Sequence, residues 1–386
     1  MKKILTSLIC LAVLTALGVS QSVAEMTQDG IDKENKIISI AGYDACTGKY
    51  GDYGLDDKRG QEIAVEEINA AGGIQAGPLK GYKLKLEFFD DRGDPKESAN
   101  VAKKISSSKY LVALGPTMSS CALASTPIFN RYGVANIITY SNASTITEQG
   151  FNNIIRLTYT TKGIADFMIT TSKSEFNAKS VAIISENQDY GQQLRKYAKD
   201  KAAEIGLTVA TDDVVTPGQD VDFSSVLLRA KNAAPDILLL FVTYNEGGMI
   251  AKQVRQMGWD VVVYGPDALT APKFFELAGD LKNVYISSLM SLDVKKTEAA
   301  HLASEFTKKY NVLPPLAAIY GYDAVKVAAN VIENGGVDRA SFIEKLKDVK
   351  IAGVGSPMYQ FDKNGEGLVP PLVVKPAQWH KDQTNQ

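Results

Sequence analysis

Residues 111–122 read LVALGPTMSSCA, and the rest of the chain is read outward from this stretch. A short apolar run, 111–114, stops at Gly115-Pro116, and Ser119 and Ser120 then open a segment suited to a helix. A buried strand that turns into a helix leaves free backbone N–H groups at the helix N-terminus, where they favour an anion. The stretch therefore predicts a strand–helix unit with an anion-binding turn.

A second strand with a polar end follows directly. Residues 135–140 form this predicted strand, which passes into Ser141, Asn142 and Ser144. Ligands of open α/β sheets lie at the carboxyl ends of the strands. We therefore expect the two turns to hold a carboxylate between them, in a site that binds rather than reacts.

Strands and helices alternate outward from these turns in two runs, 36–140 and 180–267. Such alternation is typical of parallel sheets covered by helices on both faces. The predicted fold class is therefore α/β, with two doubly wound parallel-sheet lobes. The predicted elements include the loop 44–54 and the helices 55–71, 94–106 and 298–310. They also include the strands 82–89, 135–140, 358–362 and 372–375.

The N-terminus has the features of a signal peptide. Lys2 and Lys3 precede an apolar stretch, 4–19, and Ser22-Val23-Ala24 is a small-residue cleavage site. An anchoring helix is the alternative, but the apolar stretch is short for that role. We expect an exported, soluble chain cleaved near Ala24, which places it in the periplasm. The net charge of −2 offers no basic field for nucleic acid.

After cleavage the chain keeps two cysteines, Cys46 and Cys121. Both follow predicted strands on the same face, so one disulfide is possible in an oxidising compartment. Two separate, half-buried thiols are the alternative. The sequence leaves this choice open.

The motifs that catalysis or cofactor binding requires are missing. The 386 residues include only two histidines, and neither cysteine has a histidine near it in sequence. Glycine-rich phosphate loops, the serine elbow and paired metal-ligand motifs are absent. We therefore expect no catalytic residues, no metal and no cofactor, although carboxylates are abundant enough to leave an acid–base site open.

An ordered set of motifs resembles the periplasmic binding proteins of branched-chain amino acid ABC transporters. The set spans nearly all of the chain after residue 36 and reads YGDYGLDDKRGQEIAVEEINAAGGI (50–74), DDRGDPKESANVAKKI (90–105), GPTMSS (115–120), ENQDYGQQL (186–194) and YGPDAL (264–269). The resemblance implies a type I fold, in which three crossovers form a hinge near 158–161, 288–291 and 355–357. Lobe 1 would then comprise 36–158 and 291–355, and lobe 2 would comprise 159–290 and 356–384.

The resemblance also implies a binding site for an amino acid head group. Ser119 matches the family's carboxylate-binding serine. Tyr140 matches a position that binds the ligand through its backbone. Asn142 stands where the family has Thr or Ser, and its amide would donate in place of their hydroxyl. Asp267, on the second lobe, matches the acid that faces the ligand's ammonium. That acid is Glu in the family, and Asp is shorter. The ammonium would therefore lie closer to the backbone of residue 267, or a water would bridge the ammonium and the Asp267 carboxylate.

Three further residues match positions that contact the ligand's side chain. Tyr53 and Tyr190 are aromatic positions on opposite lobes, and Thr243 stands where the family often has Tyr. The smaller Thr243 leaves room and puts a leucine-like ligand in doubt. Each residue taken alone also fits an ordinary structural role as a helix cap, a turn residue or a core aromatic.

The sequence thus predicts an exported solute-binding protein of an ABC importer, which binds an amino acid or close analogue and delivers it to a membrane permease. One alternative is a sensory module of the same fold that signals through a separate partner. Another is a carrier of a carboxylate or amide without an amine. An enzyme is disfavoured, because few nucleophile–base pairs are available.

Overall fold

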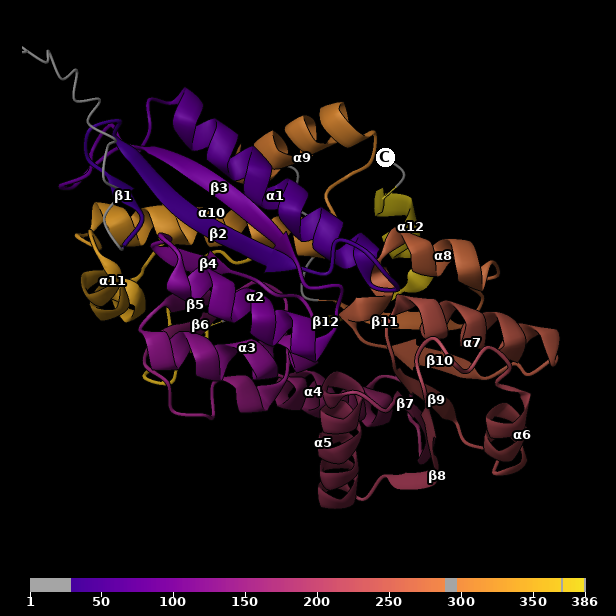
Figure 1. Ribbon diagram of the computed structural model, residues 1–386. Coiled ribbons are helices and arrows are strands. Elements are labelled where there is room, and N and C mark those ends of the chain that lie inside the picture. Colours follow the sequence, from indigo (N-terminus) through magenta and orange to yellow (C-terminus); the bar gives the residue numbers. More distant parts are fainter. Residues whose placement is uncertain (1–28, 289–296, 369–370, 385–386) are drawn as a thin grey trace, which may run out of the picture.

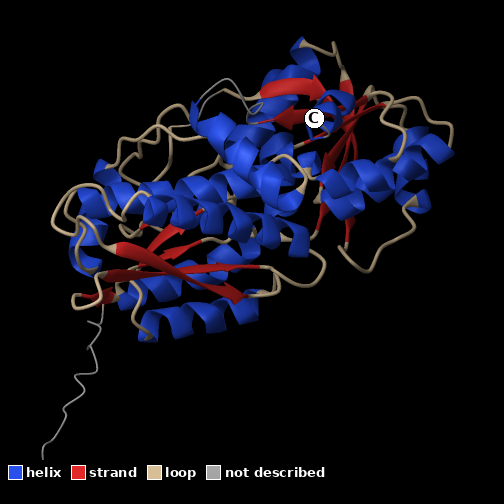
Figure 2. Ribbon diagram, turned by 90° about the horizontal axis from the view of Figure 1, so that it is seen from above, coloured by secondary structure: helices blue, strands red, loops and turns tan. Residues whose placement is uncertain are grey.

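The computed structural model describes residues 29–288, 297–368 and 371–384 (Figure 1). The predicted signal peptide, 1–24, lies outside the described residues. The chain forms two lobes, each built on a largely parallel sheet with helices on both faces, and Figure 2 shows the two sheets well separated in space. The α/β class with two doubly wound lobes is confirmed.

The first sheet contains the strand–helix units that the sequence analysis started from. The buried strand β4 pairs in parallel with β2 on one side and with β5 on the other. The short β1 is antiparallel to β2, while β3 and β6 are the parallel outer strands. The strands are β1 (Ile31–Asp32), β2 (Ile37–Asp44), β3 (Lys83–Asp90), β4 (Val112–Leu114), β5 (Ala135–Ile138) and β6 (Ile154–Arg156).

Helices from both ends of the sequence cover this sheet (Figure 1). They are α1 (Gly51–Ala70), α2 (Pro95–Ser107), α3 (Ser119–Tyr132), α9 (Thr297–Tyr310), α10 (Leu316–Glu333) and α11 (Arg339–Lys345). Helices α1 and α10 cross closely at Gly60, which has no side chain. A Cβ atom there would lie 1.9 Å from the Ala318 carbonyl oxygen. Helix α2 begins as predicted. The Asp94 side chain caps it by accepting the N–H groups of Lys96 and Glu97, and Pro95 occupies the first helical position.

The second sheet has the order β12-β11-β10-β9-β7-β8, with only β12 antiparallel among the described strands. These strands are β7 (Ser180–Glu186), β8 (Thr208–Val215), β9 (Ile237–Phe241), β10 (Val262–Gly265), β11 (Val284–Ser288) and β12 (Val373–Pro376). Strand β9 is buried along its whole length, as expected of an apolar strand inside a parallel sheet. Its helices are α4 (Thr161–Ser174), α5 (Asp189–Ile205), α6 (Ser224–Asn232), α7 (Tyr244–Gln256), α8 (Pro272–Ala278) and α12 (Ala377–Thr384).

Several predicted boundaries are wrong. Helix α1 begins at Gly51, so the predicted loop 44–54 is too long. Strand β5 ends at Ile138, which leaves Tyr140 in the turn that follows. The predicted strand 358–362 forms only isolated bridges, Ile351 with Tyr359 and Phe361 with Gly367. Strands β6 and β11 are not among the predicted elements.

The C-terminal segment returns to the first sheet before it reaches the second. Glu366 pairs with Arg156 both through the backbone and through a salt bridge. The expected third crossover at 355–357 is therefore too early, because the chain still contacts β6 at residues 365–367. We propose that lobe 1 extends to about Gly367 and that lobe 2 resumes before β12. The expected second crossover lies largely outside the described residues.

Candidate functional site

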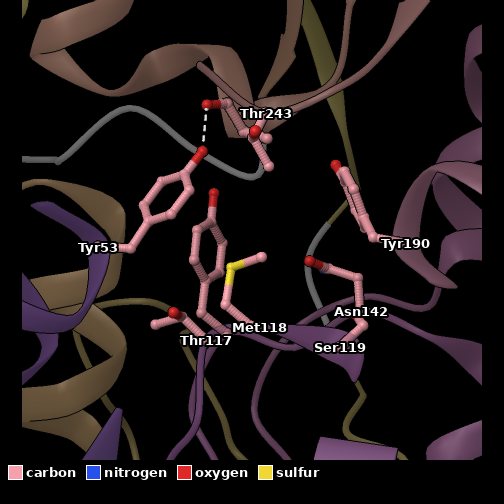
Figure 3. A pocket seen from close by; sticks show the side chains of 9 residues that line it. Tyr53, Thr117, Met118, Ser119, Asn142, Tyr190 and Thr243 are labelled. Carbon is pink, nitrogen blue, oxygen red and sulfur yellow. Dashed lines mark hydrogen bonds between the residues drawn. The ribbon is translucent and has the colours of Figure 1, made fainter. Parts of the chain in front are cut away.

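A pocket lies between the two lobes and is lined by residues that follow the carboxyl ends of strands in both sheets; Figure 3 shows the side chains around it. The space between the atoms that surround it, including its opening to solvent, is about 330 Å³. The residues that line it are Tyr53, Thr117, Met118, Ser119, Tyr140, Asn142, Tyr190, Thr243 and Ala268. Six of the seven sequence-predicted site residues are in this lining.

Ser119 is the first residue of α3 rather than its cap, which is Met118. The buried Ser119 hydroxyl oxygen accepts the Ala143 N–H at 3.1 Å, so the turn after β5 is tied to the start of α3. The hydroxyl proton is left to donate, beside the N–H groups of the first helical turn. This corner can therefore hold an oxygen that carries negative charge.

The buried Asp44 side chain binds the turn between β4 and α3. The Asp44 carboxylate accepts both the N–H and the hydroxyl of Thr117, each at 2.9 Å. Asp44 is fully buried, and burial raises the pKa of its carboxyl to about 7. These two bonds hold the backbone at the anion-binding corner in one position.

Asn142 is oriented differently from the sequence-based expectation. Its side-chain N–H₂ group donates to the Tyr159 carbonyl at 3.0 Å and to the Thr158 hydroxyl at 3.3 Å. The backbone carbonyl of Asn142 accepts the Thr161 N–H at 2.7 Å. In this structure the crossover between the lobes therefore accepts both N–H groups of the amide that the sequence analysis expects to donate to a ligand.

Asp267 lies between the lobes, in the short η2 (Asp267–Thr270). It is 1% exposed, and its Oδ2 accepts the Tyr140 hydroxyl at 2.7 Å. Its Oδ1 has no hydrogen-bond partner among the described residues. Burial raises the pKa of the Asp267 carboxyl to about 6. Asp267 is not among the lining residues, but Ala268, which follows it in sequence, and Tyr140, which donates to it, both line the pocket.

The side chain of Tyr140 contributes more than the backbone role that the resemblance implies. Besides its bond to Asp267, its ring stacks on Tyr320 at a centroid distance of 5.6 Å. Tyr320 belongs to α10 and is buried. Tyr140 therefore links the acid of lobe 2 to the core of lobe 1.

The three predicted side-chain contacts lie on facing walls of the pocket. The Tyr53 hydroxyl of lobe 1 donates to the Ala268 carbonyl of lobe 2 at 2.7 Å, and this bond is drawn in Figure 3. The Tyr190 hydroxyl, from the first turn of α5, is buried without a partner in the described structure. Thr243 precedes α7, and its N–H donates to Glu186 at 3.1 Å.

Sequence reasoning missed Thr117, Met118 and Ala268 as lining residues, and it missed Glu186 behind Thr243. Glu186 is fully buried, and burial, together with the nearby Glu246 charge, raises the pKa of its carboxyl to about 8. A usable signal existed for Met118 and Ala268, since each directly adjoins a predicted site residue.

The two thiols do not form a disulfide; both cysteines are free. Cys121 is buried, and Cys46 is half-buried with its thiol directed at the Gly54 carbonyl. Burial raises the pKa of the Cys46 thiol to about 12. Within the described ranges, no helix has the length and apolarity to cross a membrane, and no group of acidic, His or Cys side chains is arranged to hold a metal.

Comparison with known proteins gives the same picture. Residues 37–379 match the family model described as periplasmic binding protein. The Leu/Ile/Val-binding protein BraC3 of Rhizobium johnstonii is 28% identical over 315 residues, which are 81% of this chain and 84% of that protein. The leucine-, isoleucine-, valine-, threonine- and alanine-binding protein of Pseudomonas aeruginosa is 25% identical, over 96% of this chain and 97% of its own.

Among solved structures, the leucine-binding protein LivK of Thermotoga maritima superimposes with a TM-score of 0.80 at 25% identity. The match covers 87% of this chain and 94% of that chain. The residues that the family model matches include both lobes and every residue that lines the pocket. The chain therefore belongs to the periplasmic binding protein family, whose members bind solutes and are not enzymes.

Proposed function

We propose that this chain is the exported solute-binding protein of an ABC importer. It captures an amino acid or a close analogue between its two lobes in the periplasm and delivers it to a membrane permease. The relatives named above carry leucine and similar amino acids in their names, which supports this ligand class.

One observation carries the proposal: donors of lobe 1 line the pocket, and an acid of lobe 2 adjoins two of its lining residues, Ala268 in sequence and Tyr140 through a hydrogen bond. Ser119 and the N-terminus of α3 belong to lobe 1, and Asp267 belongs to lobe 2. Two hydrogen bonds already join the lobes there, from Tyr140 to Asp267 and from Tyr53 to Ala268. A zwitterion bound between them would add its own contacts to both lobes and so favour the closed arrangement.

The test is to identify what the protein holds. The mature protein is purified without denaturant, and the released small molecules are analysed by mass spectrometry. Calorimetry then follows with the twenty amino acids, their deaminated acids and their amides. We expect at least one amine-bearing compound to bind more tightly than its deaminated counterpart. A protein that binds none of these compounds would contradict the proposal.

A further inference from the structure

The loop between β2 and α1 joins the two lobes at a place outside the pocket lining. The backbone carbonyl of Lys49, in this loop, accepts the Tyr244 hydroxyl at 3.0 Å and the side-chain N–H₂ group of Asn245 at 2.8 Å. Both donors belong to the first turn of α7, in lobe 2. The Lys49 Nζ atom donates to the Pro217 carbonyl, also in lobe 2, at 3.1 Å. One residue of lobe 1 therefore makes three hydrogen bonds to lobe 2, and none of these four residues lines the pocket.

The loop that carries Lys49 is held in place by its own lobe. The Asp90 carboxylate, at the end of β3, accepts the Cys46 N–H at 2.9 Å and the Thr47 hydroxyl at 2.6 Å. The next side chain, Tyr50, is buried, and the Lys49 ammonium lies 4.7 Å from the centroid of its ring. Lobe 1 thus presents Lys49 in a fixed conformation, so little ordering cost opposes its contacts with lobe 2.

The part of lobe 2 that receives Lys49 contains two buried acids, Glu186 and Glu246. Glu246 accepts the N–H of Gly218, the residue after the Lys49 acceptor, at 2.9 Å, and the hydroxyl of Thr243 at 3.1 Å. Burial, and then the Glu246 charge, raises the pKa of the Glu186 carboxyl, whereas the Lys49 charge lowers it. In this group the positive charge comes from lobe 1 and the acids from lobe 2, so their attraction favours the closed arrangement.

Contacts of this kind affect a ligand without touching it. A ligand bound between two lobes has an apparent affinity that depends on how strongly the closed arrangement is populated. Opening the lobes must break the three hydrogen bonds of Lys49 and separate its ammonium from the two acids. Because these contacts lie outside the pocket, their contribution to closure is the same for every ligand that the pocket accepts.

We propose that Lys49, with Tyr244, Asn245 and Pro217, forms a closing latch. Lys49 is a positioning residue in this latch: it holds the lobes together and slows the release of whatever ligand lies between them. The inference rests on the proposed function, since it concerns the affinity of a solute-binding protein. It differs from the role of Ser119 and Asp267, which we assign to the ligand's own head group.

The test removes the latch from either lobe in the mature protein. Lys49→Met deletes the ammonium, and Asn245→Ala deletes one donor to the Lys49 carbonyl. We expect each variant to bind about 3- to 10-fold more weakly, by the same factor for every compound of the panel that binds, because each loses one hydrogen bond. The loss should appear in the dissociation rate, measured by stopped flow.

Two further variants control for charge and for side-chain length. Lys49→Arg keeps a charged donor and should stay within about twofold of the wild-type affinity. Lys33→Met makes the same change in net charge at an exposed turn between β1 and β2, and should bind like the wild type. Melting temperatures confirm that each variant is folded.

The outcomes distinguish the latch from the proposed function. Unchanged affinity in either latch variant, or a loss that differs more than about threefold from one ligand to another, overturns the latch and leaves the solute-binding function standing. If no compound of the panel binds, the proposed function fails, and small-angle scattering then decides on the latch. Lys49→Met should have a larger radius of gyration than the wild type, and equal radii would overturn the latch as well.

Discussion

Replacing Asp267 with asparagine separates the charge of this residue from its shape. Asn keeps an oxygen that can accept the Tyr140 hydroxyl, which donates to Asp267 at 2.7 Å. The Asn variant loses the negative charge that we propose binds the ligand's ammonium. A hydrogen bond to a charged group contributes roughly 1.5–3 kcal/mol. Affinity for an amine-bearing ligand should therefore fall about 10- to 150-fold, and affinity for the deaminated analogue should change little.

The same change should raise the stability of the unliganded protein. Burial raises the pKa of Asp267 from 3.8 to about 6, which corresponds to roughly 3 kcal/mol. Because the folded-state pKa lies above the unfolded one, this group favours the folded state below pH 3.8, and the contribution is lost as the pH rises through 6. At pH 7 the wild type carries the full cost of the buried charge, whereas Asn carries none.

Calorimetry and urea unfolding at pH 4 and pH 7 test both halves of this prediction. Asp267→Asn should unfold at higher urea than the wild type at pH 7, and the difference should shrink toward pH 4. Affinity of the wild type for an amine-bearing ligand should also fall below pH 6, as the carboxylate is protonated. An unchanged dissociation constant for Asp267→Asn would refute the reasoning and remove this residue from the site.

Three other changes probe contacts around the pocket. Tyr53→Phe removes the bond to Ala268 between the lobes and should weaken ligand binding about 2- to 10-fold in calorimetry; an equal affinity would show that the bond is irrelevant to closure. Glu366→Ala leaves the fully buried Arg156 without its salt-bridge partner and should cost about 3 kcal/mol in urea unfolding, and an unchanged midpoint would contradict this. Ser119→Ala should weaken binding of amino acids or amides about tenfold or more, and retained affinity would exclude its hydroxyl.

The sequence by itself determined the fold class and the general location of the pocket. Apolar runs that end in Gly-Pro or Ser-Asn fix where a parallel strand stops, and strands stop at the same edge of their sheet. Ser119 and Asn142 therefore had to lie near each other once their strands were adjacent. The start of α2 was equally readable, since Asp94 and Pro95 act on backbone groups within three residues.

Only the tertiary structure decided how the polar groups are used. The Asn142 amide turns toward Thr158 and Tyr159 because the crossover passes beside it, and nothing in the local sequence indicates this. The bond from Tyr140 to Asp267 joins residues 127 positions apart. Propensity and spacing act over a few residues, whereas donors and acceptors are matched by whichever segments the folded chain brings together. The chemistry of the pocket is therefore a property of the packed lobes.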